Sequence, residues 1–313
     1  MTKPSTTANQ FATAVANIDA LVQLRHGIGD LTFFPRKIVG SQLAGQVRSS
    51  FRGRGMDFEE VRHYQAGDDV RSIDWRVTAR TETPHTKVFR EERERPVLVI
   101  ADLRRAMLFG SKRLKASTVC ELATALAWAG IDKNDRVGAL LFGPQQQITV
   151  RPRRSHHNVL QLIHGLHDLC SQLPGADSNK FTLAKLLEEG RRIAHPGTSL
   201  FVISDFHDID NASREHLYTL TRHCDLTLCQ VFDPLERQLP PAGTYPIVSN
   251  GERRLLNTRS RQLQQRCSAL FDDHNKQLQK LAAQLGMGLL RVSTDDSVVQ
   301  LLRSHYSKQR RRA

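Results

Sequence analysis

Runs of consecutive apolar residues recur along the chain after residue 96. Val97–Asp102 and Ser199–Asp205 are apolar at almost every position and end in an aspartate. A run of this kind predicts a strand covered on both faces, as the strands of parallel sheets are. Similar runs predict strands at residues 136–142, 226–232 and 288–292, an edge strand at 147–151, and an Asn-Gly hairpin between 245–248 and 253–256.

Segments with apolar residues at helical spacing separate these strands. They predict helices at residues 112–131, 159–169, 182–194, 212–223, 263–285 and 296–306. The alternation predicts an α/β domain over residues 96–306 with a doubly wound, mostly parallel sheet. Ligands of such sheets bind beyond the carboxyl ends of the strands. We therefore expect the candidate site near Asp102 and Asp205.

The first 95 residues have a different pattern. An amphipathic helix is expected within residues 1–30, from the spacing of Phe11, Val15, Ile18 and Val22. Residues 31–95 predict a small strand-rich subdomain, with a second strand at 86–90. Its first strand is expected where Ile73, Trp75 and Val77 alternate with polar residues, which predicts that Trp75 is buried. A basic tail, 307–313, follows the main domain.

Composition then narrows the classes of function. The chain has 313 residues, five cysteines without a CxxC pair, and no apolar run near the ~20 residues that span a bilayer. These features predict no transmembrane segment and favour a cytoplasmic protein. The net charge of +13 favours acidic proteins, nucleic acid or anionic membranes as partners.

One segment and one strand together resemble a known family. The segment Gly53–Thr81 reads GRGMDFEEVRHYQAGDDVRSIDWRVTART, and the strand ending at Asp102 follows it closely. Over about residues 40–235 the chain resembles bacterial domain-of-unknown-function family fifty-eight. That family is similar to von Willebrand factor A domains and is commonly encoded beside MoxR-type AAA+ ATPases. The resemblance implies a von Willebrand factor A-like fold and a non-enzymatic adaptor or partner of such an ATPase, in a chaperone-like or assembly system.

Acids and arginines interleave in this segment. The motif positions expected to be structural are Gly53, Gly55, Phe58, Tyr64, Gly67, Asp68, Asp69, Asp74, Trp75 and Arg80. Such density predicts either an internal network of ion pairs or a docking surface, and the pattern leaves both open. The arginines assigned to partner binding, here and in the main domain, are Arg54, Arg62, Arg71, Arg104 and Arg105.

The resemblance also implies a metal position that this chain has altered. Von Willebrand factor A domains hold a divalent ion with an Asp-x-Ser-x-Ser loop, a threonine and a second aspartate. Asp102, Thr182 and Asp205 match three of these positions, but Arg104 and Ala106 stand where the serines belong. Two oxygen ligands are missing and a positive charge is added, so we expect a degenerate site without metal or other cofactor. Either Arg104 or Arg105 pairs with Asp102 and Asp205 in place of the ion, or both arginines face solvent.

Other functions find less support in the residues. Gly53-Arg-Gly55 lacks the Lys-Ser/Thr ending of a phosphate-binding P-loop, and no HExxH or Ser/His/Asp signature is present, so we expect no enzyme. The alternative from another class is nucleic-acid binding, in which Phe58, Tyr64 and Trp75 stack on bases. Aromatic residues make up only 6% of the chain, which disfavours that alternative.

Overall fold

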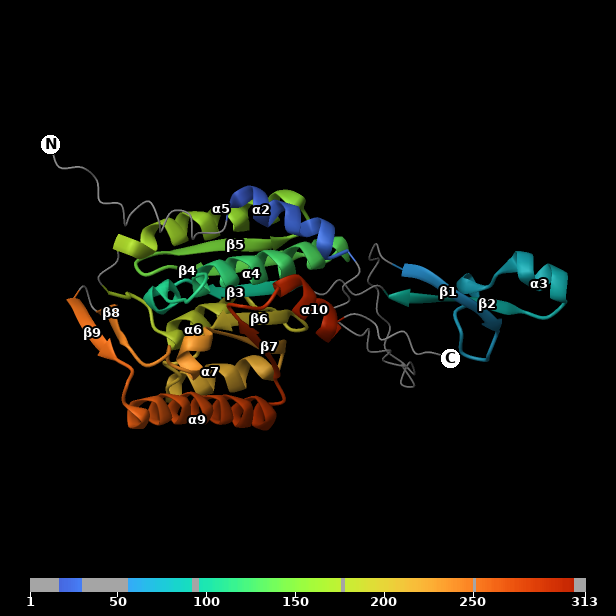
Figure 1. Cartoon of the computed structure of the whole chain (residues 1–313). Helices are drawn as coiled ribbons and strands as arrows, with labels where there is room; N and C mark the ends of the chain where they lie inside the picture. The colour runs from blue at the N-terminus through green and yellow to red at the C-terminus, as the bar shows by residue number, and fades with distance from the viewer. Residues whose placement is uncertain (1–16, 30–55, 92–95, 176–177, 250–251, 307–313) are drawn as a thin grey trace. The chain divides into compact units, whose positions relative to one another are not determined.

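A computed structural model describes residues 17–29, 56–91, 96–175, 178–249 and 252–306. The chain separates into two compact units. Unit 1 comprises residues 1–35 and 95–313, and unit 2 comprises residues 36–94. Figure 1 labels the helices and strands of both units.

In the described part of the chain, unit 1 is built on a six-stranded sheet. Its strands are β3 (Val97–Asp102), β4 (Val137–Phe142), β5 (Gln147–Arg153), β6 (Ser199–Ser204), β7 (Asp225–Phe232) and β10 (Gly288–Ser293). Their spatial order is β10-β7-β6-β3-β4-β5, with β5 antiparallel to β4 and all other neighbours parallel. The predicted fold class, a doubly wound and mostly parallel sheet, is confirmed. The strand order reverses between β3 and β6, the place where such sheets bind ligands.

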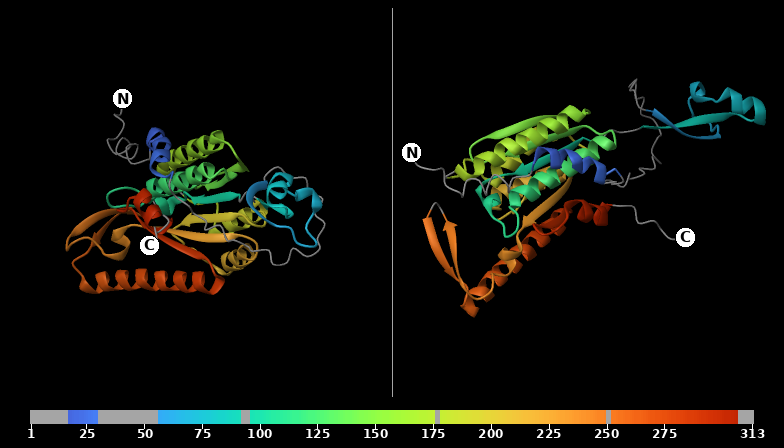
Figure 2. Two further views of the ribbon diagram at one scale, coloured as in Figure 1. Left: turned by 90° about the vertical axis from the view of Figure 1, so that its right-hand side faces the viewer. Right: turned by 45° about the horizontal axis from the view of Figure 1, so that its top comes forward.

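Helices cover both faces of this sheet, as Figures 1 and 2 show. The longer ones are α4 (Lys115–Asp132), α5 (His156–Gln172), α6 (Leu183–Ile193), α7 (Asn211–Thr221), α9 (Arg261–Leu285) and α10 (Val298–Tyr306). Helices α4, α5 and α10 pack on the face formed by Val97, Val99 and Ala101 of β3. Helices α6, α7 and α9 pack on the opposite face, formed by Leu98 and Ile100. Burial on both faces explains the unbroken apolar run of β3.

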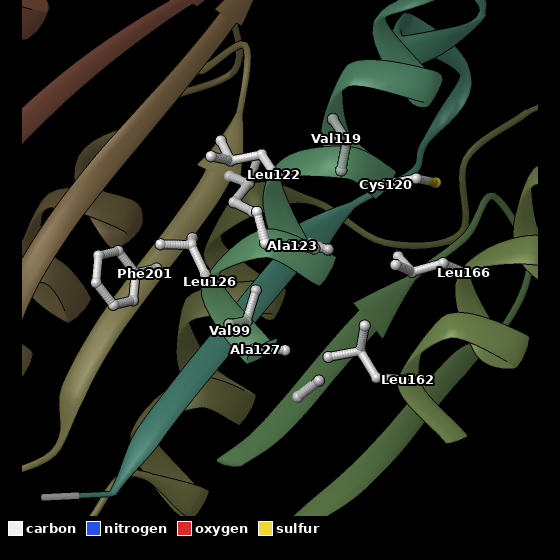
Figure 3. Packing of buried hydrophobic residues seen from close by; sticks show 14 of the residues in the cluster. Val99, Val119, Cys120, Leu122, Ala123, Leu126, Ala127, Leu162, Leu166 and Phe201 are labelled. Carbon is white, nitrogen blue, oxygen red and sulfur yellow. The ribbon is translucent and has the colours of Figure 1, made fainter. Parts of the chain in front are cut away.

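Helix α4 is the centre of the larger core (Figure 3). It is buried along almost its whole length, and Leu122 and Leu126 are fully buried against the sheet. Leu162 and Leu166 of α5 pack in the same cluster. Full burial of a leucine stabilises the fold by about 1.5–3 kcal/mol. The apolar helix predicted at 112–131 is therefore confirmed as a core element. Among the described residues, no helix is both long and apolar enough to cross a membrane.

Short elements complete unit 1. They are α2 (Ile18–Gln23), α8 (Pro234–Arg237), the 3-10 helices η1 (Leu24–Gly27), η3 (Arg105–Leu108) and η4 (Leu173–Gly175), and the hairpin strands β8 (Thr244–Ser249) and β9 (Glu252–Asn257). The hairpin is confirmed, although its turn residues 250–251 lie outside the described residues. Helix α2 begins after its cap, Asn17, and Trp128 donates a hydrogen bond to Leu21 O at 3.4 Å. Of the predicted N-terminal helix, Phe11 and Val15 lie outside the described residues.

Unit 2 contains a two-stranded antiparallel sheet and a short helix. Its elements are β1 (Met56–His63), η2 (Val70–Ser72), α3 (Trp75–Thr81) and β2 (His85–Glu91). The strand predicted at 86–90 is confirmed as part of β2. The strand predicted through Ile73, Trp75 and Val77 is wrong, because a helix begins there. Asp74 caps that helix by accepting the backbone N–H groups of Arg76 and Val77 at 3.1 and 3.2 Å.

The predicted burial of Trp75 is also wrong. Trp75 is the first residue of α3 and is 70% exposed. Only Ile73 pairs with a strand, in an isolated antiparallel bridge to Thr86. The chain turns into the helix at the next residue, so the side chain of Trp75 leaves the surface that a continuing strand would have buried.

Candidate functional site

Polar side chains gather where the parallel strands of unit 1 end. Asp102 ends β3, Asp205 follows β6, Asp233 follows β7 and Thr294 follows β10. Asp102 is 1% exposed, Asp205 3% and Asp233 0%. A buried carboxylate is stable only when it is ion-paired or hydrogen-bonded. The partners of these three acids therefore define the site.

Asp102 accepts four hydrogen bonds. Its Oδ1 accepts the backbone N–H of Arg104 at 3.0 Å and the Nε–H of the same residue at 2.9 Å. Its Oδ2 accepts Nη2 of Arg104 at 2.8 Å and the hydroxyl of Ser204 at 2.7 Å. The guanidinium thus contacts both carboxylate oxygens, a bidentate geometry that strengthens such pairs. These bonds hold the turn after β3 against the end of β6.

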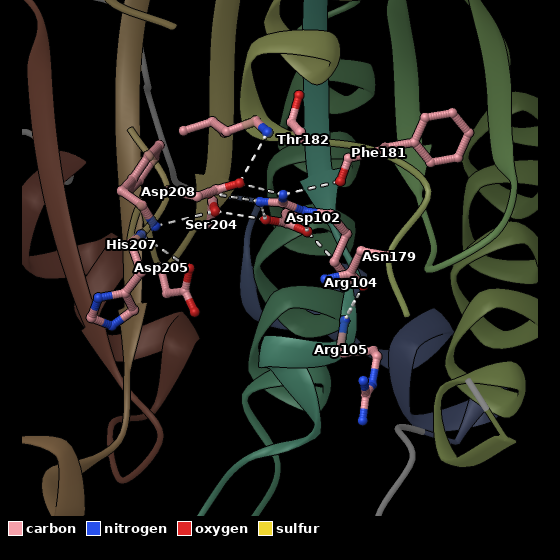
Figure 4. A network of polar contacts seen from close by, with 12 residues as sticks. Asp102, Arg104, Arg105, Asn179, Phe181, Thr182, Ser204, Asp205, His207 and Asp208 are labelled. Carbon is pink, nitrogen blue, oxygen red and sulfur yellow. Dashed lines mark hydrogen bonds and ion pairs between the residues drawn. The ribbon is translucent and has the colours of Figure 1, made fainter. Parts of the chain in front are cut away.

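The guanidinium of Arg104 also reaches a second carboxylate (Figure 4). Nη1 donates to Asp208 Oδ2 at 2.5 Å and to Phe181 O at 3.3 Å, and Nη2 donates to Asp208 Oδ1 at 3.0 Å. All five N–H donors of an arginine are then engaged. Asp208 Oδ2 also accepts the backbone N–H of Leu183, the first residue of α6. One side chain therefore joins the loops after β3, before α6 and after β6.

The electrostatics of this cluster favour the ionised forms. Burial alone would lower the pKa of Arg104, but hydrogen bonds and Coulombic attraction from Asp102 and Asp208 outweigh burial and raise it. Burial alone would raise the pKa of Asp208, but its hydrogen bonds and attraction to Arg104 lower it below the ordinary 3.8. Arg104 therefore remains a fixed positive charge that pairs with both carboxylates.

A second buried cation pairs with the acid that follows β6. Lys115, the first residue of α4, is 2% exposed and donates to Asp205 Oδ2 at 3.0 Å and to Glu236 Oε1 at 2.7 Å. Burial would lower the pKa of Lys115, but attraction to Asp205 and Glu236 raises it. Glu236 also accepts the backbone N–H of Asp233 at 3.2 Å, which completes the capping box of α8. This second cluster links the end of β6 to α4 and α8.

The third buried acid, Asp233, needs no cation. Its Oδ2 accepts the backbone N–H and the hydroxyl of Ser111 at 2.8 and 2.9 Å and the hydroxyl of Thr294 at 2.6 Å. Burial acts to raise the pKa of Asp233, and these hydrogen bonds lower it. The loop before α4 is thereby attached to the ends of β7 and β10.

Part of the expected arrangement is present and part is not. Arg104 pairs with Asp102, as one of the two alternatives predicted. It does not bridge to Asp205, which pairs with Lys115, and the second acid of the Arg104 cluster is Asp208. The prediction that one arginine joins Asp102 to Asp205 is therefore wrong, because a lysine on α4 already neutralises the second acid.

The other predicted positions lie around this cluster. The hydroxyl of Thr182 caps α6 by accepting the backbone N–H of Lys185 at 3.3 Å. The backbone N–H of Arg105 donates to Asn179 Oδ1 at 3.0 Å. Ala106 is exposed in η3. Arg104 is buried, so its guanidinium contacts acids of its own chain and does not present a surface charge.

A divalent ion does not fit among these residues. Hard cations need several free oxygen ligands, but Asp102 already accepts four hydrogen bonds and the hydroxyl of Thr182 caps a helix. The guanidinium of Arg104 lies between Asp102 and Asp208, where it would repel a cation. Within the described ranges, no group of three or more His, Cys, Asp or Glu side chains could hold a metal ion.

Sequence reasoning missed several residues of the site, namely Lys115, Ser204, Asp208, Asp233 and Glu236. The sequence around two of them, Lys115 and Asp208, has a feature that could have identified them. Lys115 is a charged residue at the start of a helix that is otherwise apolar on most sides. Asp208 lies three residues after Asp205, in the same loop at the end of β6.

In unit 2, the acids of the sequence motif mainly organise the backbone. Asp68 pairs with Arg62 at 2.7 Å and accepts the backbone N–H of Gln65. Asp69 and Asp74 cap η2 and α3. Among the other motif positions, the hydroxyl of Tyr64 donates to Asp68 O at 3.2 Å, and Gly67 has a φ of 111°. Phe58 lies on β1, and Arg71 and Arg80 are exposed. Gly53, Arg54 and Gly55 lie outside the described residues.

A family model described as "Protein of unknown function DUF58" matches residues 60–277. Among curated relatives, Uncharacterized protein Rv1480 of Mycobacterium tuberculosis and Uncharacterized protein Mb1516 of Mycobacterium bovis are each 30% identical over 196 residues. Each match covers 61% of this chain and 59% of the relative, so the chain spans less than two thirds of their length.

Similarity to solved structures is weaker. BatB from Bacteroides thetaiotaomicron has a TM-score of 0.44 and 15% identity, covering 67% of this chain and 96% of that one. The von Willebrand factor type A structure from Catenulispora acidiphila has a TM-score of 0.33 and 12% identity, covering 47% and 35%. The SpRpn10 VWA domain has a TM-score of 0.35 and 8% identity, covering 68% and 95%. At these values the similarity says nothing about ligands or partners.

Proposed function

The chain belongs to the DUF58 family, whose function is unknown, and we propose that it is a non-enzymatic protein-interaction module whose partner is a MoxR-type AAA+ ATPase. Its binding surface is the rim of loops at the strand ends of unit 1. We further propose that the metal site of the von Willebrand factor A type is degenerate here and that Arg104 takes the place of the ion.

The observation that carries this proposal is that every N–H donor of the Arg104 guanidinium is already hydrogen-bonded within the chain. A general base needs a carboxylate that can reach a substrate, but Asp102 is 1% exposed and accepts four hydrogen bonds. The neighbouring acid, Asp205, is equally buried and paired with Lys115. The acids at the strand ends are therefore committed to internal contacts, which supports binding over catalysis.

The same contacts explain how the strand ends serve binding. Arg104 ties together the turn after β3, the segment before α6 and the loop after β6. Loops at the ends of a rigid sheet are common binding surfaces. Fixing them before the partner arrives lowers the entropy lost on association. An arginine does this permanently, so binding is expected to be independent of divalent cations.

The identity of the partner rests on the family resemblance and on charge. A net charge of +13 favours an acidic partner surface. We place the interaction in the cytoplasm.

The test is a binding measurement between the purified chain and a purified MoxR-type ATPase from the same organism, without nucleotide, in EDTA and in MgCl2. We expect saturable binding with the same Kd in both buffers. Ala106 is exposed on η3, so Ala106→Arg adds bulk to the rim without disturbing the core. It should weaken binding at least tenfold at unchanged Tm.

Ala283→Arg is the matched control, because Ala283 is exposed near the end of α9, away from the strand-end loops. Its Kd should equal that of the wild type. No binding by the wild-type chain would contradict the proposed function. If the purified chain instead carries nucleic acid that nuclease treatment removes, and does not bind the ATPase, the nucleic-acid-binding alternative is favoured.

A further inference from the structure

Unit 2 has an exposed tryptophan at the start of a helix that is hydrogen-bonded to β2. Trp75 is 70% exposed, and Val70, in the preceding turn, is 61% exposed. A large aromatic side chain left in water forgoes the stabilisation that burial gives. Tryptophan is enriched in the buried cores of protein interfaces relative to the rest of the surface.

The backbone beneath Trp75 is fixed by several contacts. Asp74 caps α3 and its backbone N–H donates to His85 O at 2.9 Å. The Thr78 hydroxyl accepts the backbone N–H of His85 at 3.0 Å, and the Ser72 hydroxyl contacts that of Thr86 at 2.7 Å. Helix α3 is thereby attached to β2. The position of Trp75 is set before any partner binds, which is how the anchor residues of strong interfaces behave.

Three arginines close to Trp75 in the sequence have no acidic partner among the described residues. Arg71, Arg76 and Arg80 are exposed, and within the described residues none of them forms an ion pair. Two acids close to them in the sequence, Asp69 and Asp74, accept backbone N–H groups as helix caps, and Asp74 pairs with Lys87. Arg76 and Arg80 are four residues apart, so they lie on the same side of α3 and repel each other. An acidic partner would remove this repulsion.

We propose that Trp75, Val70, Arg71, Arg76 and Arg80 form a docking surface for an acidic protein surface that holds an apolar pocket. The pocket takes the indole of Trp75, and carboxylates around it pair with the arginines. Tryptophan and arginine are enriched among the residues that dominate binding energy. The proposal rests on the proposed function, and it adds a second contact with the same ATPase, separate from the strand-end loops.

The composition of the surface favours protein over nucleic acid. Single-stranded nucleic acids bind along several aromatic side chains on which successive bases stack. Here the second exposed apolar residue is Val70, which offers no ring for stacking. Tyr64 of unit 2 is partly buried, and its hydroxyl donates a hydrogen bond to Asp68 O.

Trp75→Ala and the double variant Arg76→Glu/Arg80→Glu test the proposal in the full chain. Binding to the purified nucleotide-free ATPase is measured at low and moderate salt, and to a labelled single-stranded oligonucleotide in parallel. We expect each variant to weaken ATPase binding at least tenfold, with unchanged Tm. The salt dependence of the double variant should be shallower than that of the wild type, because fewer ion pairs remain.

Tyr218→Ala is the matched control, since Tyr218 is 55% exposed on α7 of unit 1. The proposal is supported if Tyr218→Ala binds the ATPase with wild-type affinity and Trp75→Ala binds it more weakly. If both unit 2 variants bind like the wild type while Ala106→Arg does not, this inference is wrong and the proposed function stands. If the wild type itself fails to bind the ATPase, both are wrong. Oligonucleotide binding that depends on Trp75 would overturn the choice of an acidic protein.

Discussion

Arg104 and Asp208 are 104 positions apart in the chain, yet two hydrogen bonds of 2.5 and 3.0 Å join them. Asp102 holds the other side of the same guanidinium at 2.8 and 2.9 Å. The loops after β3 and β6 therefore share one positive charge between two carboxylates. The stability of the strand ends should depend on that charge.

Arg104→Ala should lower the free energy of unfolding by about 3–5 kcal/mol, because removing one partner leaves a buried charge uncompensated. Adding Asp102→Asn should recover part of that loss, since the remaining buried side chain is then neutral. Urea denaturation of both variants measures the difference. Arg192→Ala serves as the control, because Arg192 is 59% exposed and pairs with Glu188 and Glu189 at the surface, where ion pairs add little stability. Equal losses in Arg104→Ala and Arg192→Ala would contradict the assigned role.

The stability that Asp208 contributes should depend on pH at the acid end. Its contacts with Arg104 lower its pKa in the folded state below 3.8, against the opposing effect of burial. A depressed carboxyl pKa stabilises the fold above the pKa of the unfolded state, and the contribution is lost as pH falls through the folded pKa. The wild type should therefore exceed Asp208→Asn in Tm at pH 7, and the difference should shrink steadily below pH 4. A difference that grows on acidification would refute this assignment.

Lys115→Met should destabilise the fold by about 3–5 kcal/mol, because Asp205 loses its cation in a buried setting. Methionine fills a similar volume, so the loss reports charge and not a cavity. The raised pKa of Lys115 predicts a contribution that is full below pH 10.5 and is lost only as pH rises through the higher folded value. Calorimetry at pH 7 and in alkali checks both statements. Lys276→Met is the control, since the side chain of Lys276 is 77% exposed.

The cysteines should divide by reactivity. Cys120 and Cys170 are buried with their sulfurs 3.3 Å apart, and the contact with Cys170 together with burial raises the pKa of Cys120 well above 9.0. Burial likewise raises the pKa of Cys229. All three thiols are buried away from reagents in solvent, so these three should react with a thiol reagent only after unfolding. In the native protein, labelling at pH 8 followed by mass spectrometry should find Cys267 and, more slowly, Cys224, which are partly exposed.

Strands β3, β4 and β6 of unit 1 were predictable because each is buried on both faces. Val97–Asp102 was predicted as a strand and is β3 with the same bounds. A strand that is buried on both faces needs apolar residues at nearly every position, and this continuous apolar run can be read directly from the sequence. Helix α3 was not predictable in this way. Ile73, Trp75 and Val77 fit a strand over so short a stretch, and only the cap at Asp74 distinguishes the helix.

The candidate site was predictable only at its strand ends. Asp102 and Asp205 follow strands, so parallel pairing brings them to one edge of the sheet. Their cations could not be assigned, because Lys115 lies 90 positions from Asp205 and reaches it from a helix. Arg104 turns inward because Phe181 O and Asp208 accept its hydrogen bonds. These acceptors are distant in the sequence, so the residues around Arg104 and Arg105 could not predict which of the two arginines is buried.

Unit 2 is inserted within unit 1, since unit 1 continues on both sides of residues 36–94. On one side the chain leaves the N-terminal segment after Ile28, which is 1% exposed, and on the other it enters β3 at Val97. A mechanical force applied to unit 2 therefore travels along two covalent routes. One of them ends in the central strand, whose backbone is bonded to β4 on one side and β6 on the other. A pull on unit 2 along this second route would load both ladders at once, and β3 could slide only when both sets of hydrogen bonds broke together.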